Sequence, residues 1–316
     1  MPELPDIEAY RHALHHTLVE RELFWLRIHH PFLLRSVGVP PEDAIGSAVT
    51  AVHRYGKRIG LEFAGGTVFV FHLMIAGRFK WAPAAGDGLP QAPPAGRPNP
   101  KSGALAAFGF QSGILSLTEA GSKRRASLHV VRSAEQAAAL SRGGLELLEA
   151  GTTPNDFRNA LRRENHTLKR ALTDPRLFSG IGNSYSDEIL FAAGLSPFAM
   201  SQSLSDADAD RLFGSAVELL REWTDRLVRE AGERFPTRVT AFRSEMHVHG
   251  KYNQPCDRCG TAIQRIRYAE NECNYCPTCQ TGGKIYADRA LSRLLKGDWP
   301  RTVEELEKLN HPPGGS

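Results

Sequence analysis

The sequence lacks any long apolar run. None approaches the ~18 consecutive apolar residues that a helix needs to cross a bilayer. The first residues, MPELPDIEAY, also lack the basic stretch and apolar segment that together make a secretory signal. These absences argue against an integral membrane protein and predict a cytoplasmic protein without a membrane partner.

Cysteine is scarce and confined to one place. The chain has 5 cysteines, all between Cys256 and Cys279, and an odd, clustered set is a poor disulfide framework. Two Cys-x-x-Cys pairs flank residues 260–275, which leaves room for a β-hairpin between them. Such pairs close a tetrahedron of thiolates around a metal, so we expect one structural Zn²⁺. The expected ligands are Cys256, Cys259, Cys276 and Cys279.

Two further inferences follow from this cysteine pattern. A site closed by four thiolates has no open coordination position, so the zinc is expected to hold structure and not to catalyse. Cys273 is left over and is not expected to be a ligand.

The chain also has no strong excess of either charge. Its net charge is +4 and its pI is about 8.8, which permits a nucleic-acid partner without establishing one. Hydrophobic residues at 41% and charged residues at 23% are typical of a globular protein with a buried core. A length of 316 residues favours two domains with a small appendage.

The apolar pattern predicts an α+β fold with strands and helices in separate parts of the chain. Ile7, Tyr10, Leu14 and Leu18 recur at helical spacing, with acidic residues in the expected first turn. A strand-like pattern follows, and a stretch rich in Pro, Gly and Ala at 82–103 is expected to be a loop. The expected strands are 59–63, 67–73, 105–110, 113–118 and 127–131.

From about residue 134 to 232 the pattern is helical, with helices expected at 166–173 and 184–193. We therefore expect a β-rich domain at 1–132, a helical domain at 133–235 and a cysteine-bearing ribbon at 236–282. A C-terminal extension at 283–316 is expected to contain one helix near 285–296 and to pack on the ribbon.

Four motifs, taken in order, resemble the formamidopyrimidine-DNA glycosylase/endonuclease VIII family. The first is Pro2-Glu3-Leu4-Pro5-Asp6, and the second comprises Lys57 in RYGKRIGLEF and His72 in HLMIAGR. The third is SGIGNSYSDEILFAAGLSPF at 179–198, and the fourth is the cysteine ribbon. The resemblance covers roughly residues 2–280. It implies an N-terminal catalytic β-sandwich, a helix–two-turn–helix domain and a zinc-ribbon hairpin.

The family resemblance implies a bifunctional DNA glycosylase and apurinic/apyrimidinic (AP) lyase of base excision repair. Members lose the initiator Met and use the proline amine as a nucleophile that forms a Schiff base. An N-terminal amine has an ordinary pKa of about 7.7–8.0, so a useful fraction is neutral at cellular pH. Glu3 is the expected proton shuttle, and Lys57 is expected to contact the lesion's phosphate or to assist proton transfer. Alone, a Pro-Glu pair is usually a helix start, and a turn lysine usually faces solvent.

The resemblance also implies contacts with damaged double-stranded DNA, bound by a monomer. Asn183 is expected on the phosphate backbone, with Lys169 as a further candidate for phosphate contact and His72 as a further DNA-binding residue. Glycines before Asn183 let a backbone approach a phosphate at a helix N-terminus. Without the other motifs, the same turn reads as a plain interhelical loop with a capping asparagine.

Such enzymes extrude the target base and fill the gap in the stack. The matching residues here are Ile75, Arg124 and Arg125, although a solvated basic turn is the ordinary interpretation of the arginines. The family commonly has methionine where Ile75 stands and an aromatic residue where Ala126 stands.

The ribbon and the stretch before it also depart from the family. The phosphate-clasping arginine of the ribbon is replaced by Asn271, with Arg265 or Arg267 as possible substitutes. The stretch 236–249 is too short for the loop that covers 8-oxoguanine in the formamidopyrimidine branch, which favours the endonuclease VIII side or a divergent branch. The preferred lesion stays open.

Two other functions compete with this hypothesis. A non-catalytic damaged-DNA-binding protein would keep the clamp and ribbon, but it would have no need for Pro2, Glu3 and Lys57. A tautomerase acting on small metabolites would also use a proline amine, but the clamp and ribbon would then be unexplained.

Overall fold

The structure is a computed structural model that describes residues 1–84, 103–120, 123–232, 234–236, 239–240, 242–268, 271–286 and 300–310. The chain divides into two compact units. The first combines Met1–Gly143 with Arg221–Thr240, and the second combines Gly144–Leu220 with Ala241–Ser316. The four-part division expected from the sequence stays a prediction. In the described ranges, no helix is long and apolar enough to cross a membrane.

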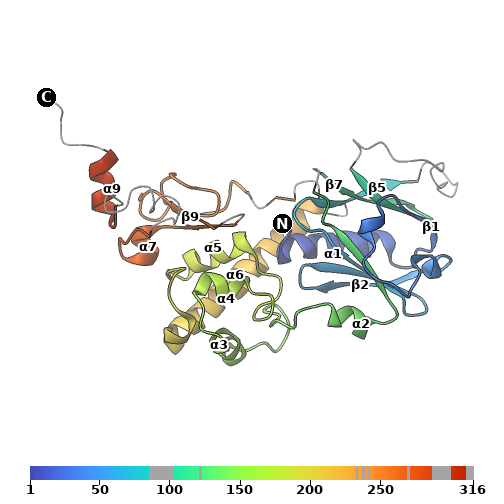
Figure 1. Ribbon diagram of the computed structural model, residues 1–316, viewed down its shortest axis with the longest axis horizontal. Helices are drawn as coiled ribbons and strands as arrows, with labels where there is room; N and C mark the ends of the chain where they lie inside the picture. The colour runs from blue at the N-terminus through green and yellow to red at the C-terminus, as the bar shows by residue number, and fades with distance from the viewer. Residues whose placement is uncertain are drawn as a thin grey trace. The chain divides into compact units, whose positions relative to one another are not determined.

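Two antiparallel four-stranded sheets form the body of the first unit (Figure 1). One has the order β1-β6-β7-β5, with β1 at Leu23–Ile28, β6 at Ala104–Phe110, β7 at Gly113–Glu119 and β5 at Gly77–Pro83. The other has the order β2-β3-β4-β8, with β2 at Val49–Tyr55, β3 at Arg58–Phe63, β4 at Val68–His72 and β8 at Ser127–Val131.

The core of this unit lies between the two sheets. Phe71 of β4 makes edge-to-face contacts with Phe79 of β5 and Phe108 of β6, at ring-centroid distances of 5.1 and 5.5 Å. Alternate residues of β3, namely Ile59, Leu61 and Phe63, point into the same cluster. The expected β-sandwich with period-two strands is therefore present.

Helix α1 (Leu4–Leu18) packs its apolar face on the sandwich, as the sequence predicted. Ile7, Tyr10, Leu14 and Leu18 are all fully buried. An ion pair fastens the polar side, because Arg54 of β2 donates from Nε to Oε1 of Glu8 at 2.6 Å. Figure 1 shows α1 beside β2. Short elements complete the unit: η1 (Pro31–Leu33), η2 (Pro41–Ala44) and α2 (Ala134–Ala139).

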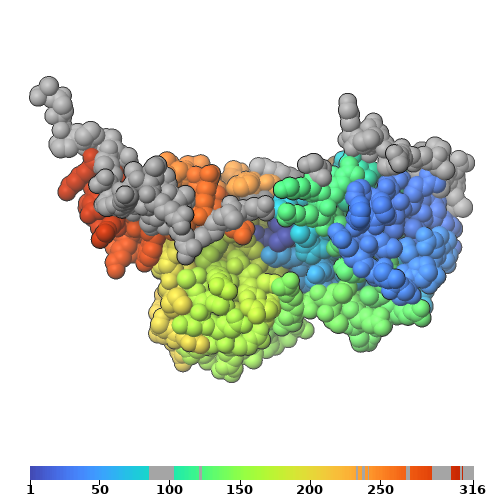
Figure 2. All heavy atoms as spheres, in the orientation of Figure 1, coloured from blue at the N-terminus to red at the C-terminus, as the bar shows by residue number. Residues whose placement is uncertain are grey.

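Helices form the first part of the second unit. They are α3 (Pro154–Arg162), α4 (Leu168–Thr173), α5 (Asn183–Ala192), η4 (Ser201–Ser203) and the start of α6, which runs over Asp206–Ala231. In the space-filling view, the atoms of this helical segment form one closely packed body, coloured yellow-green (Figure 2). The expected helices at 166–173 and 184–193 correspond to α4 and α5.

The cysteine ribbon follows as the hairpin β9 (Gln264–Tyr268) and β10 (Asn271–Tyr275) and the short helix α7 (Pro277–Thr281). Buried carboxylates on α5 attach it to the helices. Glu188 accepts the backbone N–H groups of His247, Val248 and His249 at 2.8–2.9 Å. Asp187 accepts from the His249 ring at 2.8 Å and from the backbone N–H of Asn274 at 3.1 Å.

The extension folds back on the ribbon. The N–H of Tyr286 donates to the hydroxyl oxygen of Tyr275 in β10 at 2.9 Å, and the Tyr286 ring also packs on Phe198 of the helical segment at a centroid distance of 4.2 Å. Within the extension, the N–H of Ile285 donates to the carbonyl of Arg301 at 2.8 Å. The described extension also contains α9 (Val303–Asn310), which the sequence analysis did not predict. Of the helix expected at 285–296, only residues 285 and 286 are among the described residues.

The five expected strands are confirmed to within one residue, but β1, β2 and β5 were missed. The loop predicted at 82–103 is wrong at its start, because β5 continues to Pro83. A proline is tolerated there because β5 is an edge strand. The remainder of that loop, from residue 85 to 102, lies outside the described residues.

Replacing Phe71 should destabilise the first unit strongly. Phe71→Ala removes a fully buried ring that joins the two sheets, and we expect a loss of about 3–5 kcal/mol. Urea denaturation followed by far-ultraviolet circular dichroism measures the loss. Phe32→Ala is the matched control, because Phe32 is 68% exposed, and we expect a change within about 0.5 kcal/mol. Equal effects of the two changes would contradict the assigned core.

Candidate active site and zinc centre

The N-terminal residues are enclosed at the start of α1. Pro2 is buried and Glu3 is only 3% exposed. The backbone N–H of Glu3 donates to Oδ2 of Asp6 at 3.0 Å, which fixes the chain direction where the helix begins. The helix-start interpretation of the Pro-Glu pair is therefore correct, and it also places both residues in an enclosed position suited to chemistry.

The amino group at this terminus lies among four charged side chains. Burial lowers the pKa of the Met1 amine below its ordinary value. Glu3 and Asp6 oppose this shift, whereas Arg78 and Lys57 reinforce it. The structure thus brings Glu3 and Lys57 together near the N-terminus, as the resemblance implied. No role at the amine was predicted for Asp6 or Arg78, although Asp6 belongs to the first family motif and to the expected first helical turn.

Lys57 lies in a two-residue turn between β2 and β3. The pairing of Tyr55 with Arg58 leaves Gly56 and Lys57 to make the turn, and Gly56 takes a φ of 64°, where glycine is strongly preferred. Arg54 donates from Nη1 to the carbonyl of Gly56 at 3.2 Å. Because Arg54 also pairs with Glu8, the turn that carries Lys57 is tied to α1.

His72 ends β4 as a neutral imidazole. Burial, reinforced by Arg58 and Lys57, lowers the pKa of His72 to about 4. Its Nδ1 accepts the backbone N–H of Met74 at 3.2 Å, so the neutral ring carries its proton on Nε2. His72 therefore offers a single N–H donor and no charge at neutral pH.

The turn after His72 presents Ile75 to solvent. Ile75 is 55% exposed, and Met74 before it takes a φ of 52°, which is uncommon for a residue with a side chain. The turn closes tightly, because the N–H of Gly77 donates to the carbonyl of Leu73 at 2.8 Å. A Cβ at Gly77 would lie 2.2 Å from that carbonyl oxygen, so only glycine fits.

The expected basic turn follows β7. Arg124 is partly exposed and Arg125 is exposed, whereas Ala126 is 4% exposed and belongs to the sandwich core. Ala126 is thus a core residue and does not protrude as a wedge. The described residues just before Ala126, which are Lys123, Arg124 and Arg125, are all basic and at least partly exposed.

The turn before α5 has the geometry expected of an anion site. Gly180 takes a φ of 79°, and Asn183 is the first residue of the helix. Lys169 lies beside this turn and donates to the Asn183 carbonyl, Ser186 Oγ and Asp187 Oδ1, at 2.6, 2.8 and 2.6 Å. These contacts use all three hydrogens of its ammonium group. Lys169 therefore holds the first turn of α5 in place.

Asn271, which stands where the family has the ribbon arginine, is the first residue of β10. Asn271 pairs with Tyr268 in the register, next to the tip of the hairpin. Arg265 lies 4.3 Å from the centre of the Tyr252 ring and 3.8 Å from Glu272. Arg267 is exposed and lies opposite Glu272 in the register. Their suggested role as substitutes for the absent arginine stays a prediction.

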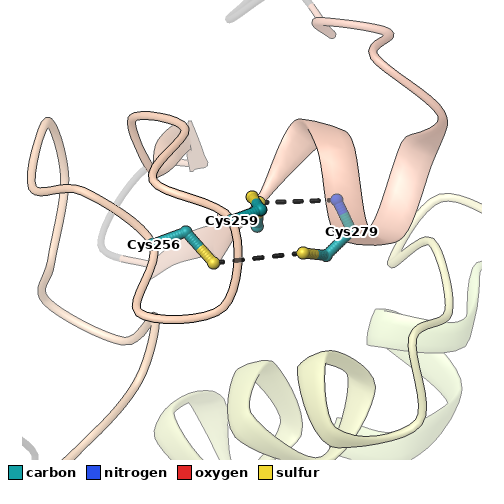
Figure 3. A group of neighbouring side chains, drawn as sticks. Cys256, Cys259 and Cys279 are labelled. Carbon is teal, nitrogen blue, oxygen red and sulfur yellow. Dashed lines mark hydrogen bonds between the residues drawn. The ribbon is translucent and has the colours of Figure 1, made fainter.

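The four paired cysteines converge on one point. Their sulfur atoms all lie within 4.8 Å of one another, at 3.4 Å for Cys259–Cys276 and 4.0 Å for Cys256–Cys279. A tetrahedral zinc with Zn–S bonds of about 2.3 Å has sulfur–sulfur edges of about 3.8 Å, so the cluster fits this ion. Figure 3 shows the sulfur atoms of Cys256 and Cys279 turned toward each other. Cys273 is buried and lies outside the cluster, as expected.

A second group of possible metal ligands is occupied by ion pairs. Glu164, His166 and Asp174 lie close together, but Arg176 donates to both carboxylates, at 3.2 and 2.6 Å. The His166 ring also contacts Glu164 at 2.7 Å. This group is an ion-pair network and not a metal centre.

Substitution of single cysteines should distinguish the four zinc ligands from Cys273, which is not a ligand. We expect Cys276→Ser to lose the bound zinc, because a cluster with one thiolate fewer no longer closes the tetrahedron. Cys273→Ala is the matched control and should keep about one zinc per chain. Inductively coupled plasma mass spectrometry of the purified proteins measures the metal. Zinc loss in Cys273→Ala with full retention in Cys276→Ser would contradict the assigned ligands.

Comparisons with known proteins agree with this arrangement. Three family models match successive parts of the chain: the formamidopyrimidine-DNA glycosylase N-terminal domain at 1–114, its H2TH domain at 144–226, and the zinc finger found in FPG and IleRS at 253–282. The last match contains the four clustered cysteines, which hold one zinc ion.

Individual relatives extend over most of the chain. The chain is 30% identical over 290 residues to the formamidopyrimidine-DNA glycosylase of Thermus thermophilus, covering 90% of this chain and 100% of that protein. It is 38% identical over 153 residues to an uncharacterised formamidopyrimidine-DNA glycosylase-like protein of Mycobacterium tuberculosis, covering 48% of this chain and 94% of that protein.

A solved structure shares the fold. The crystal structure of the MutM (Fpg) protein from Thermus thermophilus matches with a TM-score of 0.72 and 28% identity, over 88% of this chain and 98% of that one. The matched domains and the relatives lead to one conclusion: this chain belongs to the formamidopyrimidine-DNA glycosylase/endonuclease VIII family.

Proposed function

We propose that this protein is a bifunctional DNA glycosylase and AP lyase that removes oxidised bases from double-stranded DNA, with the amine of Pro2 as its nucleophile. The observation that carries the proposal is the enclosure of Pro2 and Glu3 at the start of α1, with Lys57 close enough to act on the terminal amine. The family relatives named as glycosylases support the same reaction class.

The first step uses the neutral amine. In a form of the protein that begins at Pro2, the proline nitrogen becomes the terminal amine, in a position more buried than Met1. Burial disfavours its protonated form and so keeps the lone pair available. The lone pair forms a bond to C1′ of the damaged nucleotide. The glycosidic bond breaks, and the departing base takes the bonding electrons and a proton. The proline nitrogen, now bonded to C1′ and positively charged, loses its own proton and so regains a lone pair for the next step.

The second step opens the sugar and cuts the strand. A proton passes to O4′ as the C1′–O4′ bond breaks, and the amine is left as an iminium. The iminium acidifies the C2′ hydrogen, and removal of that proton expels the 3′ phosphate. Glu3 is the proposed carrier of both protons because it adjoins the nucleophile and is nearly fully buried. Water then hydrolyses the iminium and frees Pro2.

The DNA contacts fall on both units. We assign phosphate contacts to Lys57 and to the Nε2–H of His72 in the first unit, and to Asn183 at the start of α5 in the second. The zinc gives the ribbon a fixed shape and takes no part in the chemistry. A solved Lactococcus lactis Fpg structure with the same fold, at a TM-score of 0.74 and 22% identity, is a complex with DNA that contains an abasic site.

Borohydride trapping tests the nucleophile. We expect a covalent protein–DNA band on duplexes that carry a lesion, because borohydride reduces the iminium to a stable amine. Comparing an abasic site, 8-oxoguanine and an oxidised pyrimidine identifies the lesion class. Pro2→Gly and a form that retains Met1 should give at most a trace of the band.

The matched control is Pro31→Gly, which changes a proline away from the terminus and should trap normally. A wild-type protein that binds duplex DNA but traps on no lesion would overturn the proposal. That result would favour the non-catalytic damaged-DNA-binding protein.

Changing Lys57 should move the pH dependence of trapping. Its positive charge lowers the pKa of the Met1 amine, and we expect the same effect on the Pro2 amine in the form that begins at Pro2. Lys57→Met should raise that pKa, so less amine is neutral at a given acidic pH. The acidic limb of the trapping rate against pH should therefore move to higher pH. Lys80→Met, an exposed lysine of β5, is the control and should leave the limb in place. A lower rate with an unmoved limb would show that Lys57 does not act on the amine.

A further inference from the structure

The buried carboxylate of Glu119 contacts one of the two turns that carry the candidate wedge residues. Glu119 ends β7, is 2% exposed, and belongs to none of the motifs that the resemblance identified. Its Oε2 accepts the backbone N–H groups of Arg125 at 2.8 Å and Ala126 at 3.0 Å. A carboxylate that accepts two amide hydrogens makes strong, charge-assisted bonds. Glu119 therefore fixes the backbone of the basic turn.

The backbone of Glu119 also locates the other turn. In the β5–β7 register, Glu119 lies opposite Gly77, the residue that closes the turn bearing Ile75. Arg78, the next residue of β5, donates from Nη1 to the carbonyls of Ile75 and Gly77 at 3.1 and 2.7 Å. One end of the β5–β7 ladder thus sets the position of both turns.

Loss of the two Glu119 hydrogen bonds would be energetically unfavourable. The Ala126 N–H is buried, and an unpaired buried donor is unfavourable. The Ala126 side chain packs in the core and fixes one end of the turn. The Glu119 carboxylate fixes the backbone of the turn through its two hydrogen bonds. The arginine side chains before Ala126 therefore project from a fixed base.

We propose that Glu119 is a positioning residue that holds the Arg124–Arg125 turn, next to the Ile75 turn, as part of a wedge for base extrusion. This inference rests on the proposed function. Glu119 does not touch the reacting atoms in this account. Its effect falls on opening of the duplex and on sensing the opposite base, and not on the amine chemistry.

The test measures extrusion and chemistry separately. Stopped-flow fluorescence of 2-aminopurine beside the lesion reports unstacking, and borohydride trapping on a single-stranded abasic oligonucleotide reports amine chemistry without extrusion. Glu119→Ala should slow unstacking at least about tenfold, the effect of losing one charge-assisted hydrogen bond, and should leave single-strand trapping unchanged. Glu119→Gln keeps an acceptor oxygen and should recover most of the unstacking rate.

Two controls make the result specific. Glu62→Ala changes a partly exposed glutamate of β3 and should alter neither readout. In a background where Arg124 and Arg125 are both alanine, Glu119→Ala should slow unstacking no further, because the side chains that it positions are gone.

The outcomes distinguish this inference from the proposed function. Wild-type unstacking in Glu119→Ala would overturn the positioning role, as would an equal loss of single-strand trapping in a variant that melts like wild type. Absence of trapping in the wild-type protein would instead overturn the Pro2 chemistry. In that case the unstacking comparison would still decide the role of Glu119.

Discussion

Burial of the start of α1 is the constraint on which the candidate site depends. An amine that attacks a sugar must be neutral. Burial lowers the pKa of the Met1 amine, and we expect the same effect on the Pro2 amine once Met1 is removed. The terminus stays enclosed only if the chain enters α1 in a fixed direction. A hydrogen bond from the N–H of Glu3 to the carboxylate of Asp6 fixes that direction. Tyr10, fully buried and packed on Phe79, anchors the middle of the helix. The packing that stabilises α1 thus also sets the chemistry of its first residues.

The second unit uses buried charges in another way. Asp187 and Glu188 are adjacent on α5, and together they join the helical segment to the ribbon. Burial by itself would raise the pKa of Asp187, but Lys169 and His249 hold it below the ordinary value, so the carboxylate stays ionised. Lys169 also holds the Asn183 carbonyl, so one ion pair stabilises both the ribbon attachment and the candidate phosphate turn.

Local patterns in the sequence predicted much of this structure. The helical spacing of α1, the alternation in β3 and the two cysteine pairs each depend on neighbours a few residues apart. The missed features depend on distant pairing. β5 has a terminal proline and becomes a strand through its register with β7, and Glu119 acquires its role only because that register places it opposite Gly77. Likewise, the contact of Lys169 with Asp187 depends on the fold and has no local signal in the sequence, and the phosphate contact expected of Lys169 stays a prediction.

The central claim is that the covalent bond to DNA forms at Pro2. Peptide mapping by mass spectrometry of a borohydride-trapped complex, after trypsin and nuclease digestion, tests it most directly. The account predicts that the sugar adduct lies on the peptide that begins at Pro2 and ends at Arg11, on its terminal nitrogen. An adduct on a lysine would contradict the account and assign the nucleophile to a side-chain amine. For Lys57 the modified peptide would run from Tyr55 to Arg58, because trypsin does not cleave after an alkylated lysine.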